Sequence, residues 1–74
     1  MWVRTQDGEL VNLDVIPWVG VEENCVSAEV GDMEYILGTY GSEEEAKQVM
    51  NKLALWINTP SSKCVFFMPG KEEQ

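Results

Sequence analysis

Carboxylates are the most abundant chemically active side chains of this 74-residue chain, which holds 13 Asp and Glu, five Lys and Arg and no histidine. General acid/base catalysis needs two carboxylates that converge in one cleft with different environments. The acids instead form runs typical of a solvated surface, at Glu22–Glu23, Glu43–Glu45 and Glu72–Glu73. Without histidine, no serine or cysteine has the usual activating base. We predict no catalytic residues and a protein that is not an enzyme.

Metal and cofactor sites are not expected either. Cys25 and Cys64 are the only thiols, which is too few for a zinc site built from cysteine and histidine. The glycines are spread singly, as turn residues are, and form no phosphate-binding loop. In a reducing compartment both cysteines are expected to be small strand residues.

The sequence favours a cytoplasmic protein. Arg4 is followed by polar residues rather than by the apolar stretch of a signal peptide. No apolar run approaches the roughly 20 residues that span a bilayer. We therefore predict a cytoplasmic location and no membrane partner.

The net charge of −8 bears on possible partners. Phosphate-backbone binding needs clustered Lys and Arg, and the five cations here are scattered, so no direct nucleic-acid binding is expected. The acidity suits a basic protein partner, and a weaker alternative is mimicry of DNA by spaced carboxylates.

Trp2, Arg4 and Trp18 are the candidate ligand-binding residues. Trp2 and Arg4 alternate onto one face of an expected strand, where they could hold a ring and an anionic group. Alternatively, Arg4 lies over Trp2 on the outer face of the sheet. Trp18 follows Pro17 and could stack on a planar ligand, or it could fold back onto the sheet.

Leu55, Trp56 and Phe67 are the candidate interface residues. Leu55 and Trp56 fall off the apolar stripe of an expected helix, and a sheet covers only one helix face. Phe67 lies in a strand that is apolar on both faces. Leu55 and Trp56 could cover a second copy of the chain, or pack on residues 17–24 or on the C-terminal strand. The strand of Phe67 could be an interior strand or one covered by a partner.

Period-two alternation and turn signals predict strands at 2–6, 10–16, 25–30 and 33–40, with a short strand or a loop at 18–24. Asp7-Gly8 predicts a two-residue hairpin turn with positive φ at both residues, and Gly31-Asp32 a second tight turn. Expected core-facing residues are Val11, Leu13, Val15, Val26, Ala28 and Val30. Ser27 and Glu29 are expected to point outward.

A helix is predicted at about 42–58. Ser42 can cap it, with Glu45 three residues later as a capping box requires. Its apolar stripe is Ala46, Val49, Met50, Leu53 and Ile57. A C-terminal strand is expected at 63–68, with Cys64, Phe66 and Met68 on one face.

These elements predict an α+β fold, in which a small antiparallel β-sheet of four to six strands is packed by one amphipathic helix and followed by the C-terminal strand. Residues 1–70 are expected to form a single domain and 71–74 a polar tail. A chain of this size buries only about 60% of its unfolded surface, and small domains often gain stability by oligomerising. We therefore expect a homo-oligomer.

Three segments of the chain are similar to segments of a known group of proteins. They are the start Met1-Trp2-Val3-Arg4-Thr5-Gln6-Asp7, the centre from Tyr35 through Ser42 to Met50, and the end Phe66-Phe67-Met68-Pro69. They resemble short proteins of no established activity that are encoded by Gram-positive bacteria, their phages and mobile elements. Small phage accessory proteins are often inhibitors, sponges or adaptors, so the resemblance implies a context and no site residues.

The sequence thus favours a non-enzymatic, homo-oligomeric protein-interaction or inhibitor module, associated with a phage or mobile element. One alternative is a sponge that captures a small anionic, nucleotide-type signalling ligand at an oligomer interface. Another is a structural component of a phage or prophage particle.

Overall fold

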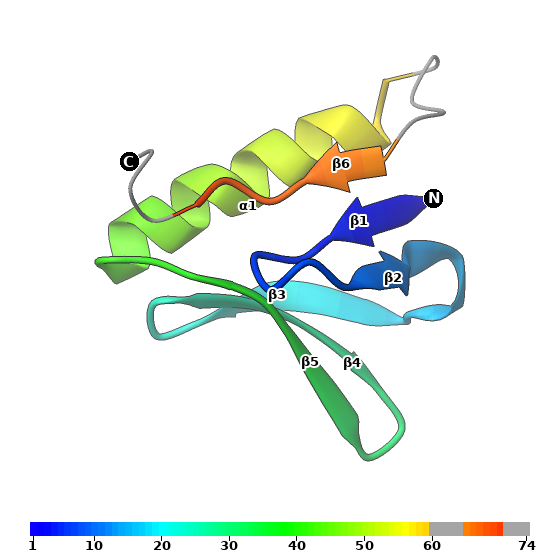
Figure 1. Cartoon of the computed structure of the whole chain (residues 1–74). Helices are drawn as coiled ribbons and strands as arrows, with labels where there is room; N and C mark the ends of the chain where they lie inside the picture. The colour runs from blue at the N-terminus through cyan, green and yellow to red at the C-terminus, as the bar shows by residue number, and fades with distance from the viewer. Residues whose placement is uncertain (60–64, 71–74) are drawn as a thin grey trace.

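The structure is a computed structural model that describes residues 1–59 and 65–70 (Figure 1). Its elements, in chain order, are β1 (Trp2–Arg4), β2 (Leu10–Asn12), the 3₁₀ helix η1 (Leu13–Val15), β3 (Trp18–Glu22), β4 (Cys25–Val30), β5 (Met33–Thr39), α1 (Glu43–Ile57) and β6 (Val65–Phe67). The α+β class predicted from the sequence is confirmed. The expected tail at 71–74 and Lys63–Cys64 lie outside the described residues.

The strands form two sheets of three rather than one. Sheet A has the order β2-β1-β6, and sheet B the order β3-β4-β5. All pairs are antiparallel except β1 and β6, which are parallel. A parallel pair needs a long crossover, and α1 lies in the crossover that returns the chain to the edge of β1 (Figure 1).

The hairpin between β1 and β2 has a three-residue turn, so the expected two-residue turn is wrong. The Thr5 N–H donates to the Glu9 carbonyl at 2.8 Å, and the Gly8 N–H donates to the Thr5 carbonyl at 2.9 Å. Of Asp7 and Gly8, only Gly8 takes a positive φ, of 90°. This is the pattern of a tight turn closed by a glycine bulge, in which one residue supplies the left-handed conformation.

The return strand ends earlier than the alternation predicted. Asn12 accepts a hydrogen bond from the Asp14 N–H at 3.0 Å and starts η1. Of the three residues expected to face the core, Val11 is buried and Leu13 half-buried, whereas Val15 is exposed. The period-two prediction fails there because an Asn side chain can bond to the backbone two residues on and replace the strand ladder.

Sheet B contains a strand where the sequence predicted either a strand or a loop, and a bulge that the sequence did not indicate. Residues 18–22 form β3 despite Gly20. In the β4–β5 pair, Val26 stands opposite Gly38 and Ser27 opposite Ile36, so Leu37 is an extra residue. Ser27 lies on the outer face as predicted, yet it is fully buried rather than exposed to solvent.

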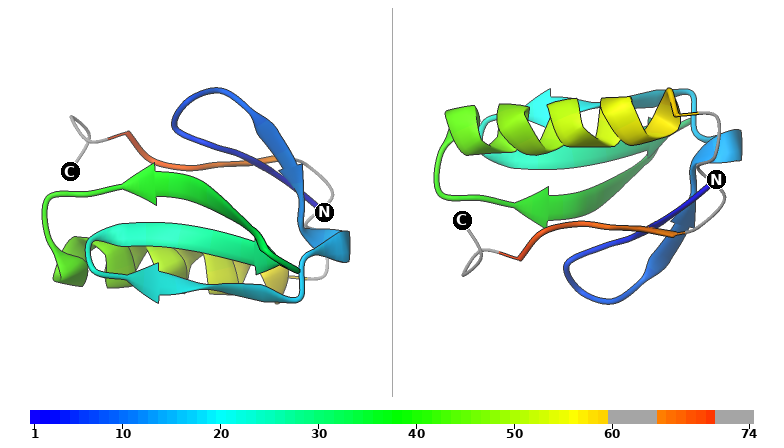
Figure 2. Two further views of the ribbon diagram at one scale, coloured as in Figure 1. Left: turned by 90° about the horizontal axis from the view of Figure 1, so that it is seen from below. Right: turned by 90° about the horizontal axis from the view of Figure 1, so that it is seen from above.

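Helix α1 begins where the capping pattern predicted. The Ser42 hydroxyl accepts a hydrogen bond from the Glu45 N–H at 3.1 Å. Ala46, Val49 and Leu53 are buried against the inner face of sheet B, whose strands β3 and β4 the helix crosses (Figure 2). No helix among the described residues is both long and apolar enough to cross a bilayer.

The apolar stripe ends on Trp56 rather than on Ile57. Trp56 is half-buried with its ring centroid 5.4 Å from that of Phe66 on β6, whereas Ile57 is exposed. The reason is the neighbouring strand: Phe66 pairs with the buried Val3 and points to the core side of sheet A, beside the last helical turn.

Gln6 joins the two sheets to the C-terminal segment. Its backbone N–H donates to the Leu37 carbonyl at 3.0 Å. Its side-chain amide accepts from the Thr39 N–H at 2.8 Å and donates to the Pro69 carbonyl at 2.8 Å. The Tyr40 hydroxyl donates to the same carbonyl at 3.0 Å.

Replacement of Gln6 by Ala should lower the free energy of unfolding by about 1–3 kcal/mol, because the part-buried Thr39 N–H loses its partner, whereas the Pro69 carbonyl loses the Gln6 amide but keeps the Tyr40 hydroxyl. Chemical denaturation measures this loss. The control is Gln48→Ala on the exposed face of α1, which should change stability little. Equal effects of the two variants would contradict the bridging role.

Candidate functional site

The outer face of sheet A is an exposed cluster that we call the aromatic face: Trp2, Arg4, Leu10 and Phe67. In the strand register Arg4 stands opposite both Leu10 on β2 and Phe67 on β6. Trp2, Leu10 and Phe67 are 46%, 57% and 64% exposed. The strand positions that share this face within the described residues include no acid. The face is thus apolar with one cation, in a chain of charge −8.

The partner of Arg4 is Phe67. The guanidinium carbon lies 6.0 Å from the centroid of the Phe67 ring, at the limit of a cation–π contact. The alternative that Arg4 lies over Trp2 is therefore replaced by a contact with an aromatic residue 63 positions along the chain. Trp2 and Arg4, predicted as ligand-binding residues, thus share a face with Phe67, predicted as an interface residue.

The other two predicted interface residues separate. Trp56 packs on Phe66, as the alternative of packing on the C-terminal strand anticipated. Leu55 is 70% exposed on α1. Leu55 and Phe67 are therefore free for contact with a partner, whereas Trp56 mainly stabilises the join between α1 and β6.

Trp18 lies on the outer face of sheet B, apart from Trp2 and Arg4. Its ring lies directly over Gly20, since a Cβ added there would come within 2.6 Å of the ring. The ring has folded back onto the sheet, which was one of the two alternatives. Gly20 permits this close approach because it has no side chain.

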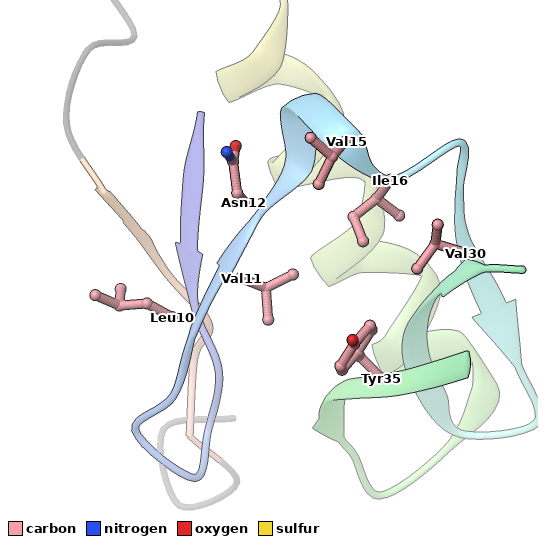
Figure 3. A pocket seen from close by; sticks show the side chains of 7 residues that line it. All are labelled: Leu10, Val11, Asn12, Val15, Ile16, Val30 and Tyr35. Carbon is pink, nitrogen blue, oxygen red and sulfur yellow. The ribbon is translucent and has the colours of Figure 1, made fainter.

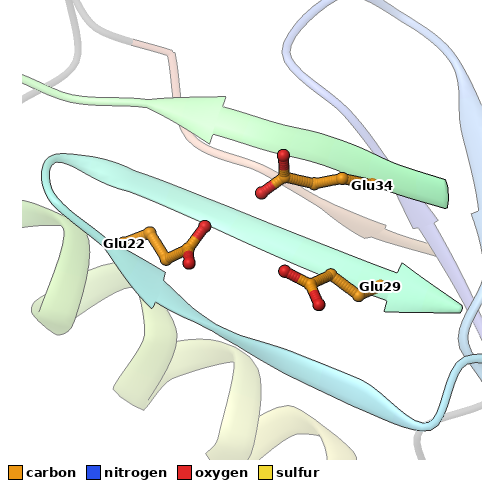
Figure 4. Close-up of side chains that lie close together, drawn as sticks. All are labelled: Glu22, Glu29 and Glu34. Carbon is orange, nitrogen blue, oxygen red and sulfur yellow. The ribbon is translucent and has the colours of Figure 1, made fainter. Parts of the chain in front are cut away.

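Three carboxylates meet on this face (Figure 4). Glu22 on β3, Glu29 on β4 and Glu34 on β5 each offer an oxygen, and these oxygens all lie within 4.8 Å of one another. We call this group the acidic triad. The sequence predicts Glu22 in a solvated acidic run, Glu29 at an outward-facing position and no metal site, because only the register of three strands brings the three carboxylates together.

Ser27 belongs to the same face. It stands opposite Gly20 on β3 and Ile36 on β5, two residues before Glu29. Its hydroxyl is fully buried and has no hydrogen-bond partner. A buried hydroxyl without a partner costs about 1–3 kcal/mol.

The acidic triad is electrostatically unfavourable. Glu34 raises the pKa of Glu22 above its ordinary value of 4.5, first through a hydrogen bond between the two carboxyls, then through repulsion, with burial adding to both. The two ion pairs seen within residues 1–59 and 65–70 lie elsewhere, at Met1–Asp14 and Glu43–Lys47. In this part of the chain, no ion pair with Lys or Arg offsets the repulsion between Glu22 and Glu34.

Two hollows adjoin these faces. A recess of about 510 Å³ beside the acidic triad is lined by Glu22, Glu23, Cys25 and Ile36. The free thiol of Cys25 lies 3.5 Å from the Thr39 hydroxyl. A smaller apolar groove of about 200 Å³ runs between the β2–η1 segment and the end of the β4–β5 hairpin, with Val11, Ile16, Val30 and Tyr35 among its lining residues (Figure 3).

Comparison with known proteins finds no match: no protein-family model, no curated protein and no solved structure is similar to this chain. The resemblance to short proteins of Gram-positive bacteria and their phages therefore stays a prediction.

Replacement of Glu34 by Gln should stabilise the metal-free protein at neutral pH. A carboxyl whose pKa is higher in the folded than in the unfolded state stabilises the folded protein at low pH. This contribution is lost as the pH rises from 4.5 through the higher, folded-state pKa. Wild type should therefore lose stability relative to Glu34→Gln as the pH rises above about 4.5, measured by thermal unfolding with a chelator present. Glu44→Gln on the exposed start of α1 is the control, and an equal pH profile for both variants would refute the coupling of Glu22 with Glu34.

Glu23 is the one non-glycine residue with a positive φ within the described part of the chain, at 55°. Glu23→Gly should raise the free energy of unfolding by about 1 kcal/mol, because glycine adopts this conformation without steric cost. Glu23→Ala removes the same charge but keeps a Cβ, so it should not reproduce the gain. If both variants stabilise equally, charge and not backbone strain is the cause.

Proposed function

We propose that this chain is a non-enzymatic binding protein that associates with a second copy of itself through the aromatic face. The observation that carries the proposal is the exposure of Trp2, Leu10 and Phe67 on one uncovered sheet face. Aromatic residues and arginine are enriched where protein surfaces meet and dominate binding energy there.

Charge favours a second copy as the occupant of this face. With a net charge of −8, two chains repel each other at most orientations. The aromatic face has no acid among its described strand positions and contains Arg4. Contact through this face therefore keeps the acidic surfaces of the two chains apart.

The area that a stable dimer buries is larger than the aromatic face alone. A stable interface removes about 800 Å² from each partner, which is roughly one-sixth of the chain's surface of 4881 Å². Three side chains do not supply that area alone. The aromatic face would thus form the centre of the contact, with neighbouring exposed residues as its rim.

A second candidate function is capture of a small planar anion. It is favoured by the Arg4 guanidinium beside the Phe67 ring, with Trp2 on the same face. A two-fold dimer would bring two Arg4 side chains to one ligand. Association with a phage or mobile element is part of the proposal and is supported by the sequence resemblance.

Native mass spectrometry and sedimentation equilibrium of the purified chain test the proposal. We expect a dimer that Phe67→Ser weakens by roughly tenfold or more, the loss typical of an interface hot spot. Met33→Ser, a change at an equally exposed residue on sheet B, should leave the dimer unchanged. A dimer that retains a small molecule of a few hundred daltons would favour ligand capture, whereas a monomer at all concentrations would refute self-association.

A further inference from the structure

We propose that the outer face of sheet B binds a hard divalent cation, with calcium the best fit, through Glu22, Glu29, Glu34 and the hydroxyl of Ser27. The proposal depends on residues of sheet B alone. It therefore holds whether or not the chain dimerises through sheet A.

The acidic triad has the chemistry and the spacing for such an ion. Carboxylate and hydroxyl oxygens are the ligands that Ca²⁺ and Mg²⁺ prefer. Oxygens bound to one Ca²⁺ at 2.3–2.6 Å lie at most about 4.6–5.2 Å apart, whereas the limit for Mg²⁺ is about 4.2 Å. The three carboxylate oxygens, all within 4.8 Å of one another, are therefore placed for Ca²⁺ without movement of the strands.

Ser27 is the independent observation that points to a ligand. In the register, Glu29 stands opposite Glu34 on β5 and Trp18 on β3, and Glu22 lies four residues beyond Trp18 on β3. Their carboxylates therefore meet over the intervening row, which is Gly20, Ser27 and Ile36. The Ser27 hydroxyl, fully buried and without a partner, lies in that row and points to the same side of the sheet.

The ion would take ligands from two sides, the sheet below it and the solvent above it. Ser27 offers a neutral oxygen on the sheet side of the ion, and the carboxylates offer three charged oxygens above it. Glu22 and Glu34 are exposed and Glu29 is half-buried, so water can complete the six to eight ligands of Ca²⁺ from the solvent side. The Trp18 ring over Gly20 forms an apolar wall beside the ion.

The decisive experiment is thermal unfolding of chelator-treated full-length chain during titration with CaCl₂. Saturating calcium should raise the melting temperature by about 4–8 °C, because the ion binds the folded state alone. MgCl₂ should act only at higher concentration, and NaCl at matched ionic strength should have no comparable effect. An equal response to NaCl would mean general screening of the acidic surface and would overturn the proposal.

Variants assign the effect to the site. Glu29→Gln and Glu34→Gln should abolish the calcium response, whereas Glu44→Gln on α1 should keep it. Ser27→Ala should weaken calcium binding by roughly tenfold without loss of metal-free stability, since it removes an unsatisfied buried hydroxyl. A wild-type calcium affinity in Glu29→Gln would overturn the site.

Terbium luminescence gives a readout that does not depend on stability. Tb³⁺ is a hard cation that can replace Ca²⁺, and excitation of Trp18 should sensitise its emission. Trp18→Phe should lose most of the emission yet keep the calcium-induced rise in melting temperature. Undiminished emission in Trp18→Phe would contradict the placement of the ion beside this ring.

Discussion

The three-way connection made by Gln6 is the constraint on which the arrangement of the molecule depends. Sheets A and B share no strand, so their relative position depends on what crosses between them. Gln6 bonds to Leu37, Thr39 and Pro69 through its backbone and its amide. The hydrogen bonds of its side chain are part-buried. Away from water, hydrogen bonds are stronger, and a polar group without a partner costs more free energy. One residue thereby holds the end of β1, the edge of β5 and the segment after β6 in register.

The outer faces of the two sheets are exposed because the single helix α1 covers only the inner face of sheet B. One helix of 15 residues covers the inner face of sheet B and contacts β6 through Trp56. The outer faces of both sheets are left without a covering element in the described part of the chain. They differ in character, since sheet A presents aromatic side chains around Arg4 and sheet B presents three converging carboxylates. Both faces therefore stay open to contact with other molecules.

Local signals predicted local structure well, and the failures have a common cause. The Ser42 cap, the buried stripe at Ala46, Val49 and Leu53, and the hairpin at Gly31-Asp32 depend on residues a few positions apart. The early end of β2, the bulge at Leu37 and the replacement of Ile57 by Trp56 depend on competing bonds or on neighbours distant in sequence. Periodicity cannot register an extra residue whose partner lies on another strand.

By itself the sequence determined the α+β class, the helix and its caps, and the acidic character of the surface, because propensity, capping and charge are properties of short segments. Only the tertiary structure decided that β6 pairs in parallel with β1, which places Phe67 beside Arg4. Likewise, it alone decided that Glu22, Glu29 and Glu34 come together on the outer face of sheet B. Both groupings join residues from different strands, and the register between strands is set by packing and loop closure across the whole chain rather than by any local pattern.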